Sequence, residues 1–416
     1  MSGKIKDLVG IIVGGGPAPG INGVISAATI EAVNEGKQVV GIMGGFKSLF
    51  EGDKNCVIPL DIATVSRLHT EGGSILRTSR DYPDKVKEKF KTLMSTLKQI
   101  GIKHLITVGG EGTLFMANWI EREARGTMNV VHVPKTIDND VPLPGGQTTF
   151  GYQTARHWGV AIVENIMEDA KTTGRWYFIT TMGRNAGYLA LGIGKASGAT
   201  VTLIGEEFRD ITHPLKKAAD ILTGSVIKRL AMGKDHGVAI LAEGICAVCP
   251  TEDLAQYEQC ELDETGRLRL SDIQLARVLK NFVKNNLDEL GIPIMIVDKR
   301  IGYELRAADP IPYDIEYTKD LGYGAIRYLL KGGTGSMIVF DQGYLKPIPF
   351  VELFDFASGR VKVRTVDLTS EGYEVARKYM IRLEKDDFEG ENLKSISRIA
   401  NLSPQDFAKR FSYVIS

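Results

Sequence analysis

The chain has 416 residues, and its 51 lysines and arginines balance 51 aspartates and glutamates, so the formal net charge is zero. This balance argues against a general nucleic-acid or membrane-surface binder, which would carry a basic excess, and a composition of 43% hydrophobic and 25% charged residues excludes wholesale disorder. Glycine is in excess, with 46 residues, which suggests turns where the backbone approaches a ligand closely.

Apolar runs of strand length alternate with amphipathic helical segments along the chain. A strand is predicted at residues 8–13, a helix at 21–34 and a second strand at 38–43. Apolar residues at helical spacing from Val86 to Ile100 predict a further helix. Further strands are predicted at residues 105–108, 130–133, 176–180, 201–204, 238–241, 293–297 and 337–340. Continuous apolar strands separated by helices are typical of parallel sheets, so we expect an α/β protein with two doubly wound, three-layer α/β/α domains.

Segments rich in glycine and proline suggest where these domains meet. Residues 142–151 are the best candidate linker, and residues 331–335 form a second break. We therefore expect one domain to comprise residues 1–148 and 307–360, and the other residues 149–306 and 361–416. Residues 250–270 are polar and lack a clean period, which predicts an inserted loop or hairpin.

The four cysteines are too few for a disulfide framework. Cys246 and Cys249 have the spacing of zinc ligands, but no second pair follows and Cys260 would supply only a third ligand, so we expect reduced thiols. The apolar run near the N-terminus is too short for a signal peptide, and no run is long enough to cross a membrane. These features predict a cytoplasmic protein.

The turns that follow the predicted strands are the places to look for a ligand site, because ligands of open parallel sheets bind beyond the carboxyl ends of the strands. Gly14, Gly15 and Gly16 follow the first strand and open a helix, so their N–H groups and the helix N-terminus would suit a phosphate. The run matches neither the dinucleotide-binding nor the P-loop fingerprint. A tight turn of structural use is the alternative.

Two further turns carry carboxylates. Gly110, Glu111 and Thr113 combine a glycine turn with a carboxylate and a hydroxyl, which would suit a metal-bound phosphate or could serve only as a helix cap. The segment from Lys135 to Asp140, KTIDND, holds two carboxylates beside a lysine and a threonine. Such a group can accept a proton from a hydroxyl and neutralise a transferring phosphoryl group.

Five motifs in order, GGGPAPGIN, GGEGT, PKTIDND, MGRNAGYLAL and GYELRA, resemble the phosphofructokinase family across residues 9–314. The segment EGGSILRTSR is most similar to the longer, pyrophosphate-linked and mixed-donor branch. The resemblance implies a glycolytic kinase that uses Mg²⁺ to phosphorylate O1 of fructose 6-phosphate, giving fructose 1,6-bisphosphate. It also implies that the first domain binds the phosphoryl donor and the second the sugar, in a homo-oligomer, a dimer or tetramer, with shared active sites.

The resemblance assigns roles to individual residues. Asp138 corresponds to the general base, and Thr136, Lys135 and Arg184 to residues around the transferring phosphoryl group. Glu111 and Asp140 correspond to the magnesium-binding carboxylates. The residues that correspond to the donor side are Gly16, Phe46, Arg80, Asp81, Gly110, Gly112 and Thr113. Those that correspond to the sugar phosphate side are Ile137, Arg175 (reaching in from a neighbouring subunit), Met182, Gly183, Glu243, Tyr303 and Arg306.

Two residues bear on the donor in opposite directions. Gly112 leaves room for the α-phosphate of a nucleotide, where the aspartate of pyrophosphate users would repel it. Lys135 instead belongs to the PKTIDND form of the motif, which accompanies pyrophosphate use in this family. Because some longer ATP enzymes combine this glycine with this lysine, we expect ATP, with pyrophosphate as the alternative. Ser26 and Ile30 replace cations that bind an allosteric nucleotide in bacterial ATP enzymes, so an effector site of that type is not expected.

Overall fold

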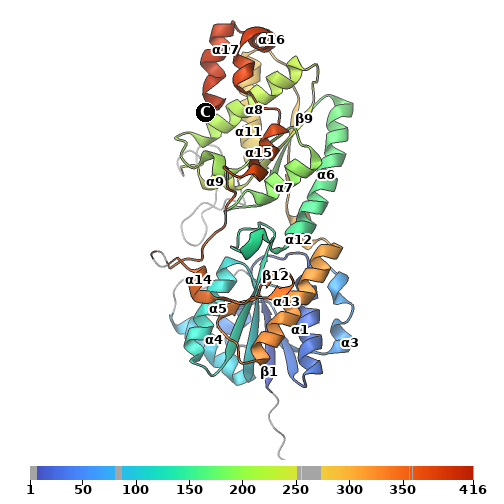
Figure 1. Cartoon of the computed structure of the whole chain (residues 1–416), viewed down its shortest axis with the longest axis vertical. Coiled ribbons are helices and arrows are strands. Elements are labelled where there is room, and N and C mark those ends of the chain that lie inside the picture. The colour runs from blue at the N-terminus through green and yellow to red at the C-terminus, as the bar shows by residue number, and fades with distance from the viewer. Residues whose placement is uncertain are drawn as a thin grey trace, which may run out of the picture. The chain divides into compact units, whose positions relative to one another are not determined.

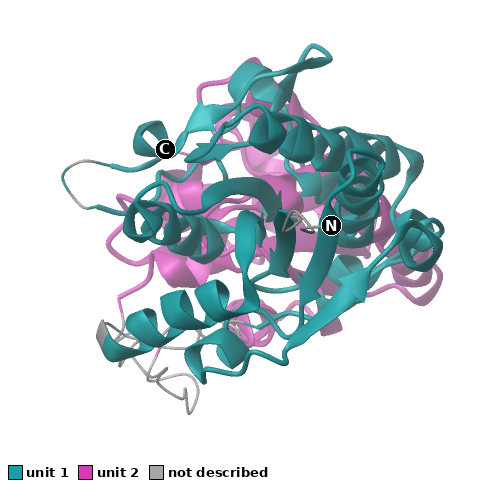
Figure 2. Cartoon of the chain, turned by 90° about the horizontal axis from the view of Figure 1, so that it is seen from below, with its two compact units in different colours: residues 1–155, 303–364 teal, residues 156–302, 365–416 magenta. Residues whose placement is uncertain are grey.

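Two sheets built largely from parallel strands form the framework of the protein (Figure 1). The computed structural model describes residues 7–79, 87–250, 254, 273–355, 357 and 359–415. The chain divides into two compact units, and Figure 2 colours them separately. Unit 1 comprises Met1–Ala155 and Tyr303–Arg364, and unit 2 comprises Arg156–Gly302 and Thr365–Ser416.

The sheet of unit 1 has the strand order β14-β11-β5-β4-β1-β2-β3, with β6 paired to β5. The central strands are parallel, whereas β3 and β14 add antiparallel edges. The strands are β1 (Leu8–Val13), β2 (Gln38–Ile42), β3 (Val57–Leu60), β4 (Ile102–Gly109), β5 (Asn129–Thr136), β6 (Phe150–Gly151), β11 (Ser336–Met337) and β14 (Ile348–Pro349). A separate hairpin joins β12 (Phe340–Asp341) to β13 (Tyr344–Leu345).

Helices cover both faces of this sheet, as the burial of β1 shows. Val9, Ile11 and Val13 belong to the core beneath α1 (Ile21–Asn34) and α13 (Pro312–Leu330). Ile12 belongs to the opposite core, beneath α4 (Lys87–Ile100) and α5 (Glu111–Ala124). Helices α1 and α13 pack closely because Gly322 has no side chain: a Cβ there would lie 2.6 Å from the Val24 carbonyl oxygen. The shorter elements are α2 (Lys47–Phe50), α3 (Ile62–Val65), η1 (Leu68–Thr70), η2 (Pro144–Gly146), α12 (Tyr303–Ala307) and α14 (Phe350–Leu353).

Unit 2 has a parallel sheet in the order β10-β7-β9-β8. These strands are β7 (Trp176–Thr181), β8 (Val201–Leu203), β9 (Gly237–Ala242) and β10 (Ile296–Ile301). Strand β9 is buried along its whole length, as expected of a strand covered on both faces. The helices are α6 (Tyr152–Thr173), α7 (Tyr188–Ser197), η3 (Gly205–Phe208), α8 (Pro214–Ala231), α9 (Gly244–Ala247), α11 (Leu275–Glu289), α15 (Glu371–Lys378), η5 (Lys385–Phe388), α16 (Gly390–Ile399), α17 (Pro404–Phe411) and η6 (Ser412–Ile415).

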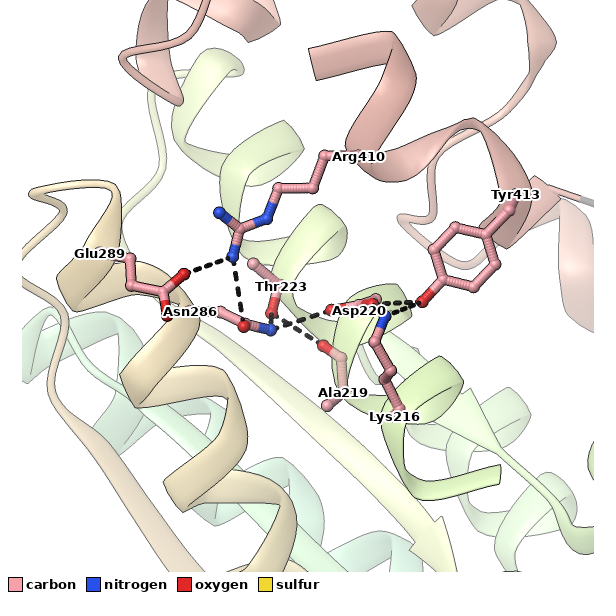
Figure 3. A network of polar contacts seen from close by, with 8 residues as sticks. All are labelled: Lys216, Ala219, Asp220, Thr223, Asn286, Glu289, Arg410 and Tyr413. Atoms are coloured by element: carbon pink, nitrogen blue, oxygen red, sulfur yellow. Dashed lines mark hydrogen bonds and ion pairs between the residues drawn. The ribbon is translucent and has the colours of Figure 1, made fainter. Parts of the chain in front are cut away.

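A polar network on α8 joins the C-terminal segment to the rest of unit 2 by hydrogen bonds (Figure 3). The buried carboxylate of Asp220 accepts hydrogen bonds from Lys216 Nζ at 2.9 Å, from Asn286 Nδ2 at 3.0 Å and from the Tyr413 hydroxyl. Arg410 of α17 donates to the Glu289 carboxylate at 3.0 Å. Helices α8 and α11 are thereby joined to the end of the chain.

The predicted α/β class is confirmed, and most predicted elements match the structure within a few residues. The single strand predicted at residues 337–340 is wrong: β11 ends at Met337, and Phe340 starts β12 because it pairs with Leu345 in the hairpin. The interpretation of residues 142–151 as a linker also fails. The chain passes from unit 1 to unit 2 between Ala155 and Arg156, within α6, because β6 is part of the unit 1 sheet.

Some sequence predictions fall where the structure gives no description. Most of the loop or hairpin predicted at residues 250–270 lies outside the described residues, and so does Cys260. Cys246 is buried, and Cys249 is half-buried. Among the helices described, none is long and apolar enough to cross a membrane.

Candidate active site

In unit 1, the turns after β1, β4 and β5 meet at one edge of the sheet. These three strands are neighbours and run parallel, so their carboxyl ends lie side by side. The Gly14 N–H donates to the Val108 carbonyl at 2.9 Å, and the Lys135 ammonium donates to the Gly16 carbonyl. Direct hydrogen bonds therefore join the predicted phosphate turn after β1 to the carboxyl ends of β4 and β5.

The turn after β4 places the N-terminus of α5 at this edge. Gly110 is the N-cap, and its carbonyl accepts the first helical bond from Leu114 N–H at 2.9 Å. Gly109 must lack a side chain, because a Cβ there would lie 2.1 Å from the Thr113 hydroxyl oxygen. Thr113 is buried, whereas Glu111 in the first turn is exposed and Gly112 is half-buried. The N-terminus of a helix can bind an anion through its first amides and its positive dipole end.

Lys135 brings a positive charge to the same place. Its side chain is only 4% exposed, and its ammonium lies against the turn after β1. A buried ammonium is costly unless a negative or strongly polar group accompanies it. The Gly16 carbonyl is one such polar group, and the charge lies where a phosphate at this edge could also contact it.

The turn after β5 holds the predicted base. The Asp138 N–H donates to the Thr136 hydroxyl at 3.0 Å, and the Thr136 carbonyl accepts from the Thr149 hydroxyl at 2.7 Å. Asp138 and Asp140 are half-buried, whereas Ile137 is buried. Asp138 is thus partly accessible on a backbone fixed by hydrogen bonds.

Beneath this turn, the sheet carries a histidine in its neutral form. His132 of β5 is fully buried, and its Nδ1 lies 2.9 Å from the Thr107 hydroxyl oxygen. Burial is the main cause that lowers the pKa of His132 from 6.5 to about 3. The ring consequently adds no positive charge to the site near neutral pH.

The other predicted donor residues are less closely tied to this edge. Phe46 is fully buried beside Phe50, with ring centroids 6.3 Å apart, so it packs as a core side chain. Arg80 and Asp81 lie outside the described residues.

In unit 2, the carboxyl ends of β7 and β9 gather a second set of polar residues. Met182, Gly183 and Arg184 follow β7, and Arg184 is exposed. Glu243 follows β9; its N–H donates to the Thr181 carbonyl at 3.0 Å, and its carboxylate lies 3.5 Å from the Arg300 guanidinium. A carboxylate and an exposed arginine on adjacent parallel strands could hold sugar hydroxyls and a phosphate.

Arg175 does not join that set. It immediately precedes β7, so it lies at the amino end of the strand, away from the carboxyl ends that carry Arg184 and Glu243. Tyr303 and Arg306 belong to unit 1, where the Arg306 guanidinium lies 4.6 Å from the centre of the Tyr303 ring. Tyr303 is 56% exposed, which rules out a role as a core aromatic.

The fit of the site to a magnesium ion depends on its carboxylates. Within the described residues, no group of three or more His, Cys, Asp or Glu side chains could hold a metal ion. Mg²⁺ commonly takes one or two carboxylates and completes its shell with water and substrate phosphates. Glu111 and Asp140 lie on the turns after adjacent strands and could each supply a carboxylate to an ion of that kind.

Sequence reasoning missed the residues that support the turn after β5. Arg364 donates to the carbonyls of Asn139 at 3.1 Å and Gln147 at 2.7 Å, and Asn139 Oδ1 accepts from Thr149 N–H at 3.1 Å. Asn139 lies within a recognised motif, but Arg364 lies in a segment without any motif. No signal in the sequence linked these two residues.

Comparison with known proteins places this geometry in a family. A sequence model described as phosphofructokinase matches residues 8–329. The chain is 51% identical, over 98% of both chains, to the pyrophosphate–fructose 6-phosphate 1-phosphotransferase of Thermotoga maritima. It is 44% identical to the enzyme of the same name from Naegleria fowleri, covering 98% of this chain and 95% of that one.

Two further similarities are more distant. The ATP-dependent 6-phosphofructokinase of Mycobacterium tuberculosis is 31% identical, over 83% of this chain and 93% of that one. Among solved structures, a pyrophosphate-dependent phosphofructokinase from Nitrosospira multiformis matches with a TM-score of 0.65 at 16% identity, covering 90% of both chains. At that identity the match supports the fold alone.

Proposed function

The chain belongs to the phosphofructokinase family and is a phosphotransferase with an alcohol acceptor, and we propose that it transfers a phosphoryl group from pyrophosphate to O1 of fructose 6-phosphate. The products are fructose 1,6-bisphosphate and orthophosphate. The observation that carries the proposal is the 51% identity, over 98% of both chains, to a relative named for this reaction.

This proposal replaces ATP, the donor expected from the sequence. Relatives named for pyrophosphate are 51% and 44% identical to the chain, against 31% for a relative named for ATP. Gly112 is a weak guide to the donor, because the space it leaves permits a nucleotide without requiring one. Lys135 is the better guide: its buried ammonium at the Gly16 carbonyl can balance a small, highly charged diphosphate. ATP remains the second candidate, on the evidence of Gly112 alone.

The base in this proposal is Asp138. Its carboxylate would accept the proton of the sugar 1-hydroxyl as O1 attacks one phosphorus of pyrophosphate. The O1–P bond forms while the bond from that phosphorus to the bridging oxygen breaks, and orthophosphate leaves. Thr136 supports this role because its hydroxyl accepts from the Asp138 N–H at 3.0 Å. Lys135 and Arg184 would stabilise the charge on the transferring group.

The remaining predicted residues have supporting roles. Gly16, Gly110 and Thr113 would bound the donor phosphates at the carboxyl edge of unit 1. Glu111 and Asp140 would hold Mg²⁺, which supplies charge neutralisation for the phosphates when bound. On the sugar side, the residues are Ile137, Met182, Gly183, Glu243, Tyr303 and Arg306.

Arg175 supports a shared active site. It lies at the amino end of β7, so it cannot join Arg184 and Glu243 at the carboxyl edge of the same sheet. Contact with a sugar phosphate would therefore have to be made in another copy of the chain. On this basis we propose a homo-oligomer, a dimer or tetramer.

The test is product analysis with purified protein, fructose 6-phosphate, pyrophosphate and Mg²⁺, followed by phosphorus NMR. We expect a new phosphate ester at carbon 1 and the reverse reaction from fructose 1,6-bisphosphate and orthophosphate. Asp138→Asn should lower turnover by about 10³-fold or more. An Asp138→Asn variant with near-normal turnover would refute the assignment of the base, and transfer to a different hydroxyl would refute the acceptor.

A further inference from the structure

Arg364 is hydrogen-bonded to the loop that carries the proposed base. Its guanidinium donates to the Asn139 carbonyl at 3.1 Å, to the Gln147 carbonyl at 2.7 Å and to Asn139 Oδ1. Its backbone N–H donates to the Asp140 carbonyl at 2.7 Å. One residue therefore contacts both of the positions that follow Asp138 and the far side of the same loop.

The residue that Arg364 holds has an unfavourable backbone. Asn139 has φ of +57°, in the left-handed region that non-glycine residues rarely adopt, although asparagine tolerates it better than most. Its side chain is 5% exposed, and Oδ1 accepts from Arg364 and from Thr149 N–H, the latter at 3.1 Å. The left-handed turn is thus maintained by contacts outside the turn itself.

The backbone that carries Arg364 is also fixed on either side. The Lys362 N–H donates to the Leu353 carbonyl at 2.8 Å, and the Thr365 carbonyl accepts from the Tyr188 hydroxyl at 2.7 Å. The guanidinium therefore projects from a restrained segment. A restrained support can hold its partner loop in one geometry.

We propose that Arg364 is a positioning residue for the phosphoryl transfer: it holds Asn139 in its left-handed conformation and thereby orients the Asp138 carboxylate towards the acceptor hydroxyl. The inference rests on the proposed role of Asp138 as base. Lysine cannot substitute, because three acceptors in different directions require the planar, multiply donating guanidinium. Displacing a reacting group by about 1 Å can lower a rate about 100-fold.

The experiment compares kcat and KM of the full-length wild type, R364M, R364K and a matched control, K362M. Lys362 lies on the same segment but is exposed, and its ammonium donates to the Glu352 carbonyl at 3.0 Å rather than to the loop that carries Asp138. We expect kcat of R364M and R364K to fall about 100-fold, while the KM values for fructose 6-phosphate and pyrophosphate stay nearly unchanged. K362M should have the kcat and KM of the wild type. In a shortened variant, R364A, added guanidinium chloride at millimolar concentration should restore part of kcat.

Variants of Asn139 separate positioning from general stability. N139G can adopt positive φ without strain, whereas N139A cannot, so N139G should keep the higher kcat. A full kcat in R364M, or a loss confined to KM, would overturn the proposal. If R364M does not fold, the proposal is tested by R364K and by the comparison of N139G with N139A. A normal kcat in R364K, together with the same kcat in N139G and N139A, would overturn the proposal.

The same series separates this proposal from the proposed function. An active D138N would refute the base itself, whatever Arg364 does. An inactive D138N together with a fully active R364M would leave the base in place and refute only the positioning role.

Discussion

His132 allows the packing beneath the loop that carries the proposed base to be tested through pH. Its ring is fully buried, and burial lowers its pKa from 6.5 to about 3, while the Gly109 carbonyl raises it and the Lys135 ammonium lowers it by smaller amounts. In the unfolded chain the imidazole takes up a proton near pH 6.5. As pH falls below 6.5, the unfolded state therefore binds more protons than the folded state, and stability is lost until pH approaches about 3.

The size of the effect follows from the two pKa values of His132. One pH unit within the window corresponds to about 1.4 kcal/mol, so between pH 7 and pH 5 the wild type should lose about 2 kcal/mol through this residue. The perturbation is His132→Asn, which keeps an amide near the Thr107 hydroxyl but does not titrate. The assay is the free energy of unfolding from urea titrations of both proteins at several pH values. Parallel pH curves for the two proteins would refute the assignment of a neutral, fully buried imidazole.

Three further substitutions test other parts of the account. Lys135→Met should lower kcat/KM for pyrophosphate by about 100-fold or more, because a buried positive charge at the proposed donor site is lost. Steady-state rates within a few-fold of the wild type would contradict this role of Lys135. Gly112→Asp should remove any ATP turnover but preserve pyrophosphate turnover, since the new carboxylate takes the place of an α-phosphate; a variant that retained ATP turnover would contradict the spatial argument. Asp220→Ala should lower the free energy of unfolding by about 3 kcal/mol in urea titrations, because the donors in Figure 3 lose a buried acceptor; a loss below about 1 kcal/mol would show that the network contributes little.

Local patterns in the sequence predicted the framework well. Strand β1 and helix α1 were predicted with the bounds that the structure has, Leu8–Val13 and Ile21–Asn34. Both are long enough for their periodicity to show, and glycines mark the turn between them. The same logic failed at residues 337–340, where a buried apolar run contains a break that only the pairing of Phe340 with Leu345 reveals.

The candidate site was predictable only where its residues lie in motifs. Asp138 and Lys135 could be found because they follow a strand in a turn of charged residues. Arg364 could not, because its contacts with Asn139 and Gln147 span more than 200 positions of the chain and depend on tertiary structure. The donor is a different case: ATP was expected from Gly112, whereas the more similar relatives are named for pyrophosphate, because available space does not identify the ligand that fills it.

The central claim is that pyrophosphate is the phosphoryl donor. The most direct test is the ratio of kcat/KM for pyrophosphate to that for ATP, measured with one preparation of purified protein, saturating fructose 6-phosphate and Mg²⁺. We predict that pyrophosphate is favoured by about 100-fold or more, which corresponds to about 2.7 kcal/mol of transition-state stabilisation. Turnover with ATP and none with pyrophosphate would contradict the account.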